Sequence, residues 1–170
     1  MTDISPDVVF MDLFETDPSF ILEENASRRN FSGADLSGKS LSGAFLAGAN
    51  LRGACMKGTK LDGANLENAD FTGADLEFAV LGGANLTGAT LCKANLKRAN
   101  LVGVHAKGAN FSEANMYYSR PGNGNFESAL FCNASVERAI FRRANLLNAD
   151  FTGAVGEANF ENAILEGVKR

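Results

Sequence analysis

Few residues in this chain are of the types that perform catalysis. The sequence contains one histidine, His105, and three cysteines, Cys55, Cys92 and Cys132. None of the four has a second histidine or cysteine at the spacing of a metal site. The glycine-rich phosphate loop and the G-x-S-x-G motif of hydrolases are also missing from the sequence. We therefore predict a protein that is not an enzyme, binds no cofactor or metal, and uses its cysteines as packing or surface thiols.

The charged residues are divided unevenly along the chain. Before residue 31 there are seven acidic and two basic residues, a net charge of −5. Residues 31 to 170 hold 14 basic and 13 acidic residues, a net charge of +1. No segment approaches the roughly 18 apolar residues that span a bilayer, and the first ten residues, MTDISPDVVF, lack the basic flank and apolar core of a secretory signal. We expect a cytoplasmic protein without membrane contact, although a targeting segment that had been removed would leave no trace here.

A five-residue repeat organises most of the chain. Read in blocks of five from Phe31, the sequence gives FSGAD, LSGKS, LSGAF, LAGAN and LRGAC, and the register holds through 25 blocks to Phe151. The first residue of each block, here called the lead, is Leu, Phe, Met or Val in 23 of the 25 blocks. The residue two before the lead is Ala in 19 blocks, and the residue just before it is Asn or Asp in 14. One small structural unit must therefore be repeated along the chain.

A period of five fits neither an amphipathic helix nor a simple strand. The chain must turn in every block, so that four blocks close a square coil of about 20 residues that is stable only when stacked on its neighbours. The lead and the Ala two before it then point inward. Gly two after the lead supplies the positive φ of the turn, and Asn or Asp bonds the backbone at the corners.

Blocks such as ADLSG, ANLRG, ADFTG and ANLTG resemble the motif of the pentapeptide-repeat family over about four fifths of the chain. The resemblance implies an all-β solenoid, a right-handed quadrilateral β-helix, with coils stacked at about 4.8 Å. We assign residues 28–170 to this β-helix, which would have about seven coils. Residues 1–27 carry no repeat, and Ser5-Pro6-Asp7 predicts a short helix over residues 6 to 15. This segment is interpreted as an N-terminal cap, with a partner-binding arm as the alternative.

Residues 20 positions apart lie above one another in such a solenoid, so columns can be read from the sequence. One inner column should contain Phe31, Leu51, Phe71, Leu91, Phe111, Phe131 and Phe151. His105 falls in an outer column of Asn65, Asn85, Asn125 and Asn145, where it replaces an Asn at a corner.

One outer column and its surroundings form the basic cluster of the predicted rod. Arg98, Tyr118 and Arg138 stand 20 residues apart, and Lys97, Arg120, Arg142 and Arg143 lie on the same or the adjoining corner. This cluster can hold an anion or an acidic partner by charge and cation–π contact. The plainer interpretation is a solvated column in which the arginine stems pack on Tyr118. The candidate partner-binding residues are therefore Arg98, Tyr118, Arg120, Arg138, Arg142 and Arg143.

Two irregularities interrupt the repeat. Pro121, in the block RPGNG, has no N–H and stands at a lead position, so we expect the wall to bulge or loop at residues 120–124, with a recognition loop as the alternative. Between Ala154 and Ala158 the register slips and Gly156 fills a lead position. We expect the last coil to narrow, with Ile164, Leu165 and Val168 folding across its mouth. That closure favours a monomer over an end-to-end homodimer.

The sequence thus predicts a scaffold that presents a rigid surface to an unidentified protein partner. The alternative is a DNA-mimicking inhibitor of DNA gyrase that confers quinolone resistance, a role which resemblance to the family allows. A DNA mimic needs a rod dense in negative charge, whereas residues 31 to 170 carry +1. Because residues 31 to 170 are nearly neutral, we do not expect the protein to bind nucleic acid directly.

Overall fold

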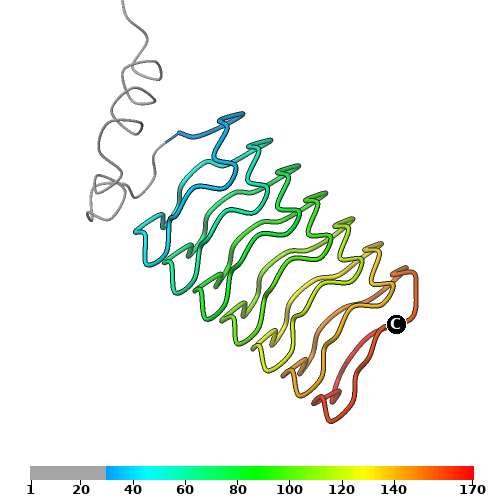
Figure 1. Cartoon of the computed structure of the whole chain (residues 1–170). Coiled ribbons are helices and arrows are strands. Elements are labelled where there is room, and N and C mark those ends of the chain that lie inside the picture. Colours follow the sequence, from blue (N-terminus) through cyan, green and yellow to red (C-terminus); the bar gives the residue numbers. More distant parts are fainter. Residues whose placement is uncertain (1–29) are drawn as a thin grey trace, which may run out of the picture.

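The computed structural model describes residues 30–170, which form a rod of stacked four-sided coils (Figure 1). Parallel bridges pair residues 20 apart from Asn30 with Asn50 up to Ser135 with Val155, and the last three pairings, which start from Ile140, Asn145 and Asp150, span 19 residues. This chain of pairings makes seven coils within residues 30–170. The expected cap over residues 1–27, with its helix from residues 6 to 15, lies outside the described residues.

Every block contributes one bridge residue and one turn, and forms no larger element of secondary structure. Within residues 30–170 there is no helix and no strand longer than a single bridge position. The bridge residue stands just before the lead, as Asp35 does, in a short extended segment whose two neighbours point inward. The lead carbonyl accepts a hydrogen bond from the N–H three residues on, at 3.0 Å for Phe31 and Ala34, so the chain turns at the two residues between them. Flat walls therefore centre on bridge residues, and corners are made by turn residues.

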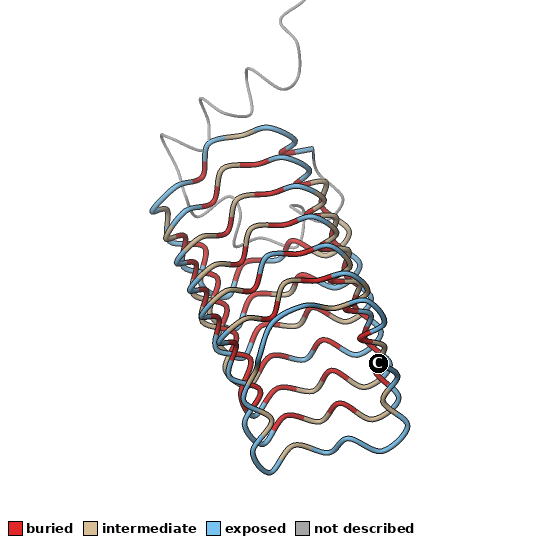
Figure 2. Ribbon diagram, turned by 90° about the vertical axis from the view of Figure 1, so that its right-hand side faces the viewer, coloured by how far each residue is buried: buried red, intermediate tan, exposed pale blue. Residues whose placement is uncertain are grey.

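This arrangement corrects one sequence interpretation. Asn, Asp and His105 were expected at corners, but they occupy bridge positions in the middle of the walls. His105 pairs with Asn85 and Asn125 and is exposed, so it does replace an Asn, though not at a corner. Buried positions alternate with less buried ones in the coils of Figure 2, and a bridge residue between two buried neighbours is the ordinary period of an extended segment.

The repeat satisfies almost every backbone N–H in a block. The lead N–H and the N–H two residues later donate to the next coil, at 2.7 Å from Phe31 to Asn50 and 2.9 Å from Gly33 to Arg52. The bridge N–H donates to the previous coil, at 2.9 Å from Cys55 to Ala34. The remaining N–H, directly after the lead, is bound by the side-chain oxygen of the bridge residue where that residue is Asn or Asp. The preference for Asn and Asp thus has a direct cause.

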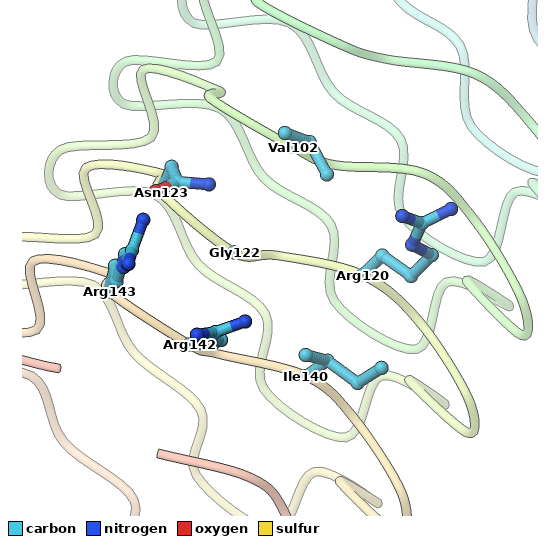
Figure 3. Close-up of a pocket in the computed structure, with 7 residues that line it drawn as sticks. All are labelled: Val102, Arg120, Gly122, Asn123, Ile140, Arg142 and Arg143. Atoms are coloured by element: carbon cyan, nitrogen blue, oxygen red, sulfur yellow. The ribbon is translucent and has the colours of Figure 1, made fainter. Parts of the chain in front are cut away.

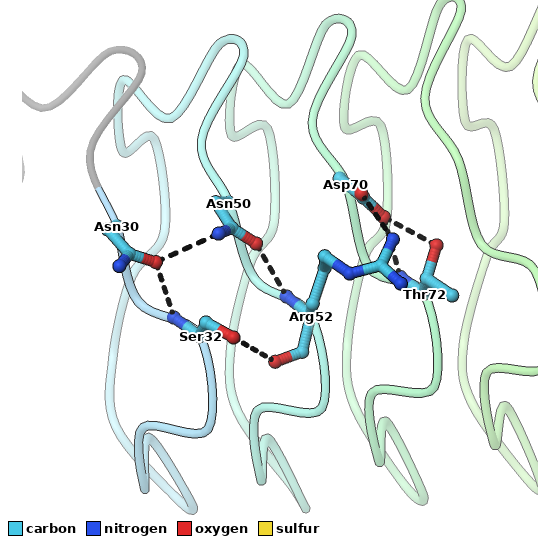
Figure 4. A network of polar contacts seen from close by, with 6 residues as sticks. All are labelled: Asn30, Ser32, Asn50, Arg52, Asp70 and Thr72. Atoms are coloured by element: carbon cyan, nitrogen blue, oxygen red, sulfur yellow. Dashed lines mark hydrogen bonds and ion pairs between the residues drawn. The ribbon is translucent and has the colours of Figure 1, made fainter.

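Side chains extend this pairing from coil to coil (Figure 4). Asn30 Oδ1 accepts from the Ser32 N–H at 3.1 Å and from the Asn50 side chain at 2.9 Å. Two coils on, Asp70 Oδ1 accepts from the Thr72 hydroxyl at 2.6 Å while Oδ2 accepts from Arg52 at 2.9 Å. The outer surface is therefore held in register by polar ladders as well as by the backbone.

The core is a stack of leads and small residues that changes composition along the rod. The predicted inner column from Phe31 to Phe151 is buried throughout, which confirms the inside–outside assignment. Leucine fills most of the first half, whereas phenylalanine is the commonest lead of the second half, where Phe131 stacks on Phe111 at 5.0 Å and on Phe151 at 4.4 Å between centroids. Each buried lead contributes about 2 kcal/mol.

The wall neither bulges nor loops at Pro121, contrary to expectation. Pro121 is buried at its lead position, and the next bridge, His105 with Asn125, keeps the 20-residue spacing. The missing N–H removes only the hydrogen bond to the Ile140 carbonyl, and no bridge joins Arg120 to Ile140 within residues 30–170. Gly124 replaces Ala in this block because a Cβ there would lie 2.5 Å from the Phe126 ring.

The slip at Gly156 is confirmed, but the closure expected after it is wrong. A Cβ at Gly156 would lie 2.6 Å from the Glu137 nitrogen, and its φ of +98° also requires glycine. Beyond it the pairings shift to 19 residues, and Phe160 stacks on Phe141 at 5.3 Å. Ile164 pairs with Asn145 in the wall and is 54% exposed, so it does not fold across the end. The side chain of a bridge residue such as Ile164 points away from the core, because the two neighbours of a bridge residue point inward.

Candidate partner-binding surface

The six candidate residues lie on one wall and the two corners that bound it. Arg120 is the bridge residue of the wall whose other bridge residues include Val80, Asn100 and Ile140. Arg98, Tyr118 and Arg138 stand at the corner before this wall, two residues after their leads. Arg142 and Arg143 form the corner after it. We call this wall with its two corners the arginine wall.

The first corner is a ladder of stacked cations and rings. The Arg98 guanidinium lies 5.5 Å from the Phe78 ring centroid and 6.0 Å from that of Tyr118, and Arg138 lies 5.1 Å from the Tyr118 ring on its other side. Arg138 also donates a hydrogen bond to the Tyr118 hydroxyl, and that contact is the main reason its pKa is raised. These are the contacts expected of a column that packs on itself, so partner binding by the ladder stays a prediction.

The ladder is built at backbone positions that favour glycine. Phe78, Arg98, Tyr118 and Arg138 have φ values of 60°, 58°, 55° and 59°. In the first two coils this corner is Gly38 and Gly58. A left-handed conformation costs a side-chain-bearing residue about 1–2 kcal/mol. The cation–π contacts, worth about 0.5–1 kcal/mol each at exposed sites, offset part of this cost.

Several cations of the arginine wall have no carboxylate to neutralise them. Within residues 30–170, Arg98, Arg120 and Arg143 form no ion pair. Lys97, by contrast, is paired with Glu77 at 3.3 Å. Most other cations of the described rod are paired from coil to coil: Arg52 with Asp70, Lys57 with Asp75 and Glu77, Lys93 with Glu113, and Lys107 with Glu127. The rod is therefore nearly neutral as a whole but locally positive at this wall.

A hollow of about 220 Å³ lies where the wall meets its second corner (Figure 3). Its rim carries three arginines and its sides are partly apolar; the lining residues are Val102, Arg120, Gly122, Asn123, Ile140, Arg142 and Arg143. The hollow exists because Val102, Gly122 and Arg142 stack in one column and the middle residue has no side chain. Arg142 Nε lies 3.4 Å from Glu161, a pair whose side chains are both about half exposed.

Sequence reasoning did not name Phe78, Val102 or Ile140 as residues of this surface. Phe78 stands 20 residues before Arg98, so the column rule could have found it. Val102 and Ile140 line the hollow that the missing side chain of Gly122 leaves open, and no periodic signal marks such an absence. Gly122 itself lies in the segment 120–124, for which a recognition loop was the alternative prediction.

Other chemistry-bearing residues of the described rod do not converge. No group of three His, Cys, Asp or Glu within residues 30–170 could hold a metal ion. Cys55, Cys92 and Cys132 are free thiols, and burial raises the pKa of Cys92. In the same part of the chain, no helix has the length and apolarity to cross a membrane.

The family assignment follows from the repeats. The sequence profile described as Pentapeptide repeats matches eight copies, over residues 30–68, 69–105, 93–120 and 125–155. The chain belongs to the pentapeptide repeat family. No sequence among the curated proteins matches this pentapeptide repeat protein.

Solved structures of pentapeptide repeat proteins are similar to it. Alr5209 from Nostoc Pcc 7120 is 35% identical, with a TM-score of 0.50, over 54% of this chain and 75% of that one. A trypsin-treated variant of QnrB1, a plasmid-mediated fluoroquinolone resistance protein, is 23% identical, with a TM-score of 0.51, over 84% of each chain. HetL, involved in heterocyst differentiation regulation in the cyanobacterium Nostoc sp. Strain PCC 7120, is 22% identical over 84% of this chain and 83% of its own, with a TM-score of 0.47. At these identities, the likeness to QnrB1 shows the fold alone.

Proposed function

We propose that this pentapeptide repeat protein is a non-catalytic scaffold that binds an acidic surface of a protein partner through the arginine wall. One observation carries the proposal: Arg98, Arg120 and Arg143 come from neighbouring coils and have no carboxylate within residues 30–170, whereas most cations elsewhere on the rod do. Arginine favours bidentate binding of carboxylates and contact with aromatic rings, which suits a protein interface.

The backbone supports this role by fixing where the arginines stand. Successive coils are joined by hydrogen bonds of 2.6–3.1 Å at nearly every lead, so side chains on neighbouring coils keep constant spacing. A surface that is already ordered loses little conformational entropy on binding. We propose that the scaffold acts in the cytoplasm, where a reducing environment suits its three free thiols.

Photocrosslinking tests the proposal. Benzoylphenylalanine placed at Tyr118 should crosslink a partner in cells, and the crosslinked partner peptides should be rich in Asp and Glu. Ser128 is the matched control, because it stands two residues after a lead in the same coil, is exposed, and has a φ of 57° against 55° for Tyr118, yet occupies the opposite corner. Equal crosslinking from both positions, or partner peptides without acidic residues, would count against the arginine wall.

Gyrase inhibition is the second candidate, and the likeness to QnrB1 is the observation that raises it. DNA mimicry requires dense negative charge, but residues 31 to 170 carry a net +1 and the arginine wall is locally positive. We therefore expect purified gyrase to supercoil DNA at the same rate with and without micromolar protein. Inhibition, or protection from a quinolone, would reverse this ranking.

A further inference from the structure

We propose that the hollow at Gly122 is a binding site for one glutamate side chain within an extended acidic segment of the partner. This inference rests on the proposed function and deepens it. The hollow, of about 220 Å³, is several times the roughly 30 Å³ that one water occupies in the liquid, so it has room for a carboxylate side chain.

The charge around the hollow favours a carboxylate. Arg120, Arg142 and Arg143 all line it, from two adjoining coils, and Figure 3 shows their side chains around Gly122. Within residues 30–170 neither Arg120 nor Arg143 forms an ion pair. Arg142 is paired only with Glu161, at 3.4 Å through Nε, which leaves other guanidinium donors of Arg142 available. Charge-assisted hydrogen bonds of this kind are the strong ones.

The backbone offers a donor where a carboxylate oxygen would fit. In neighbouring blocks of the same coil, the N–H after the lead is bound by an Asn oxygen, at 3.1 Å from Tyr117 to Asn115 and 3.2 Å from Glu127 to Asn125. Gly122 stands at the same place in its block, but its bridge residue is Arg120, whose side chain has no acceptor. No side-chain or backbone oxygen within residues 30–170 accepts a hydrogen bond from Gly122. A ligand carboxylate can supply the oxygen that Asn supplies elsewhere.

The hollow also offers an acceptor for a peptide N–H. Elsewhere on this wall the lead N–H donates to the coil above, at 3.1 Å from Leu101 to Arg120 and 2.8 Å from Phe141 to Asn159. Pro121 cannot donate, so within residues 30–170 the Ile140 carbonyl receives no hydrogen bond. A Cβ built on Gly122 would lie 3.5 Å from that oxygen, which places it at the edge of the hollow.

The apolar sides of the hollow distinguish a glutamate from a simple anion. Val102 and Ile140 line it, and Ile140 is 38% exposed. The methylene groups of a glutamate side chain can pack on these residues while its carboxylate meets the arginines. Inorganic phosphate has no such groups and no amide N–H for the Ile140 carbonyl. The geometry therefore favours a peptide over a small inorganic anion.

A titration followed by NMR tests the site directly. Hexaglutamate is added to the ¹⁵N-labelled full chain while the amides of Gly122 and Asn123 and the Nε–H signals of the three arginines are observed. We expect saturable shifts of these signals, binding at least about tenfold tighter than that of inorganic phosphate, and no shifts with hexaglutamine, since a charged hydrogen bond is worth about a factor of ten. Equal affinity for phosphate would overturn the glutamate assignment.

Two glycine substitutions separate the hollow from the general charge of the wall. Gly122→Ala leaves the charge unchanged but puts a Cβ 3.1 Å from the Arg142 carbonyl and inside the hollow, so it should weaken hexaglutamate binding about tenfold. Gly82→Ala is the control, because it lies in the same column two coils earlier and its Cβ meets nothing closer than 3.5 Å. It should bind as the wild type does. The amide spectra of both variants report whether the fold is retained.

Arg143→Gln completes the design and should weaken binding about fivefold or more. If Arg143→Gln weakens binding but Gly122→Ala does not, the hollow is not the site, while the arginine wall stands as a charged surface. If neither substitution changes binding, both the hollow and the proposed function of the wall are contradicted.

Discussion

Phe111 provides a severe test of the packing, because its whole contribution comes from the core. Its ring is fully buried, stacks on Phe131 at 5.0 Å with an interplanar angle of 7°, and meets Phe126 edge-on at 5.8 Å. Phe111→Ala removes this ring from the N-terminal end of the phenylalanine stack. We expect a loss of about 4 kcal/mol in the free energy of unfolding, because truncation of buried Phe costs about 3–5 kcal/mol and aromatic contacts add to burial.

Glu113→Ala is the matched control from the same turn. Glu113 points outward with a φ of 59°, and its ion pair with Lys93, at 3.6 Å, joins side chains that are 54% and 64% exposed. Such pairs contribute little, so this substitution should change stability by less than about 0.5 kcal/mol. Urea unfolding followed by circular dichroism measures both variants. Because solenoids can unfold in parts, a second probe such as amide exchange should give the same midpoint. Equal losses in the two variants would refute the assignment of inside and outside.

Three further predictions concern single features of the rod. Ser119→Ala should raise the free energy of unfolding by about 1 kcal/mol, as measured by urea unfolding. The buried Ser119 hydroxyl has no hydrogen-bond partner in the described structure, and most blocks carry Ala at this position. A loss of stability would show that the hydroxyl has a hydrogen-bond partner. Gly156→Ala should lower the free energy of unfolding by at least about 3 kcal/mol in the same assay, and Gly103→Ala by about 1 kcal/mol. Both glycines have a positive φ, but only Gly156 has backbone atoms within 3 Å of a new Cβ. Equal losses of stability would contradict the crowding at Gly156. Hydrogen bonds from Ser37 and Thr152 hold the pKa values of Asp35 and Asp150 below 3.8, so the stabilisation from these carboxylates is present above that pH and is lost as pH falls through the lower folded values. The melting temperature, measured from pH 5 to 2, should therefore fall less steeply for the double variant Asp35→Asn and Asp150→Asn than for the wild type. Parallel curves for the two proteins would disprove the linkage.

The sequence predicted the core of this fold more fully than its surface. Leads and Ala residues recur at a fixed interval, and stacking at a constant repeat makes residues such as Phe111 and Phe131 neighbours without further information. The length of each coil also follows, because the bridge spacing is the repeat multiplied by the number of walls. These features depend on every block being alike.

The features that were not predicted depend on one block differing from the rest. Pro121 was expected to break the wall, but the hydrogen bonds of the neighbouring blocks keep the register, and one lost bond is a small change. The walls and corners were interchanged for His105 because periodicity fixes which residues point outward but not where the chain turns. The hollow at Gly122 arises from an absent side chain, an absent N–H and an arginine in place of Asn. Such absences leave no repeated pattern to read.

The proposed function rests on the position of the unpaired arginines, and charge reversal tests that position most directly. One variant carries Arg98→Glu, Arg120→Glu and Arg143→Glu, the three arginines without an ion pair within residues 30–170. Its control carries Lys57→Glu, Lys93→Glu and Lys107→Glu, which reverse the same number of charges on corners away from the arginine wall or at its far end. Binding of the crosslinked partner, purified and titrated against each protein, is then measured by calorimetry at fixed salt. Partner affinity should fall at least about a hundredfold in the arginine variant and less than about fivefold in the lysine variant, since several charged contacts are reversed only in the first. Equal losses in the two variants, or retained affinity in the arginine variant, would contradict the arginine wall as the binding surface.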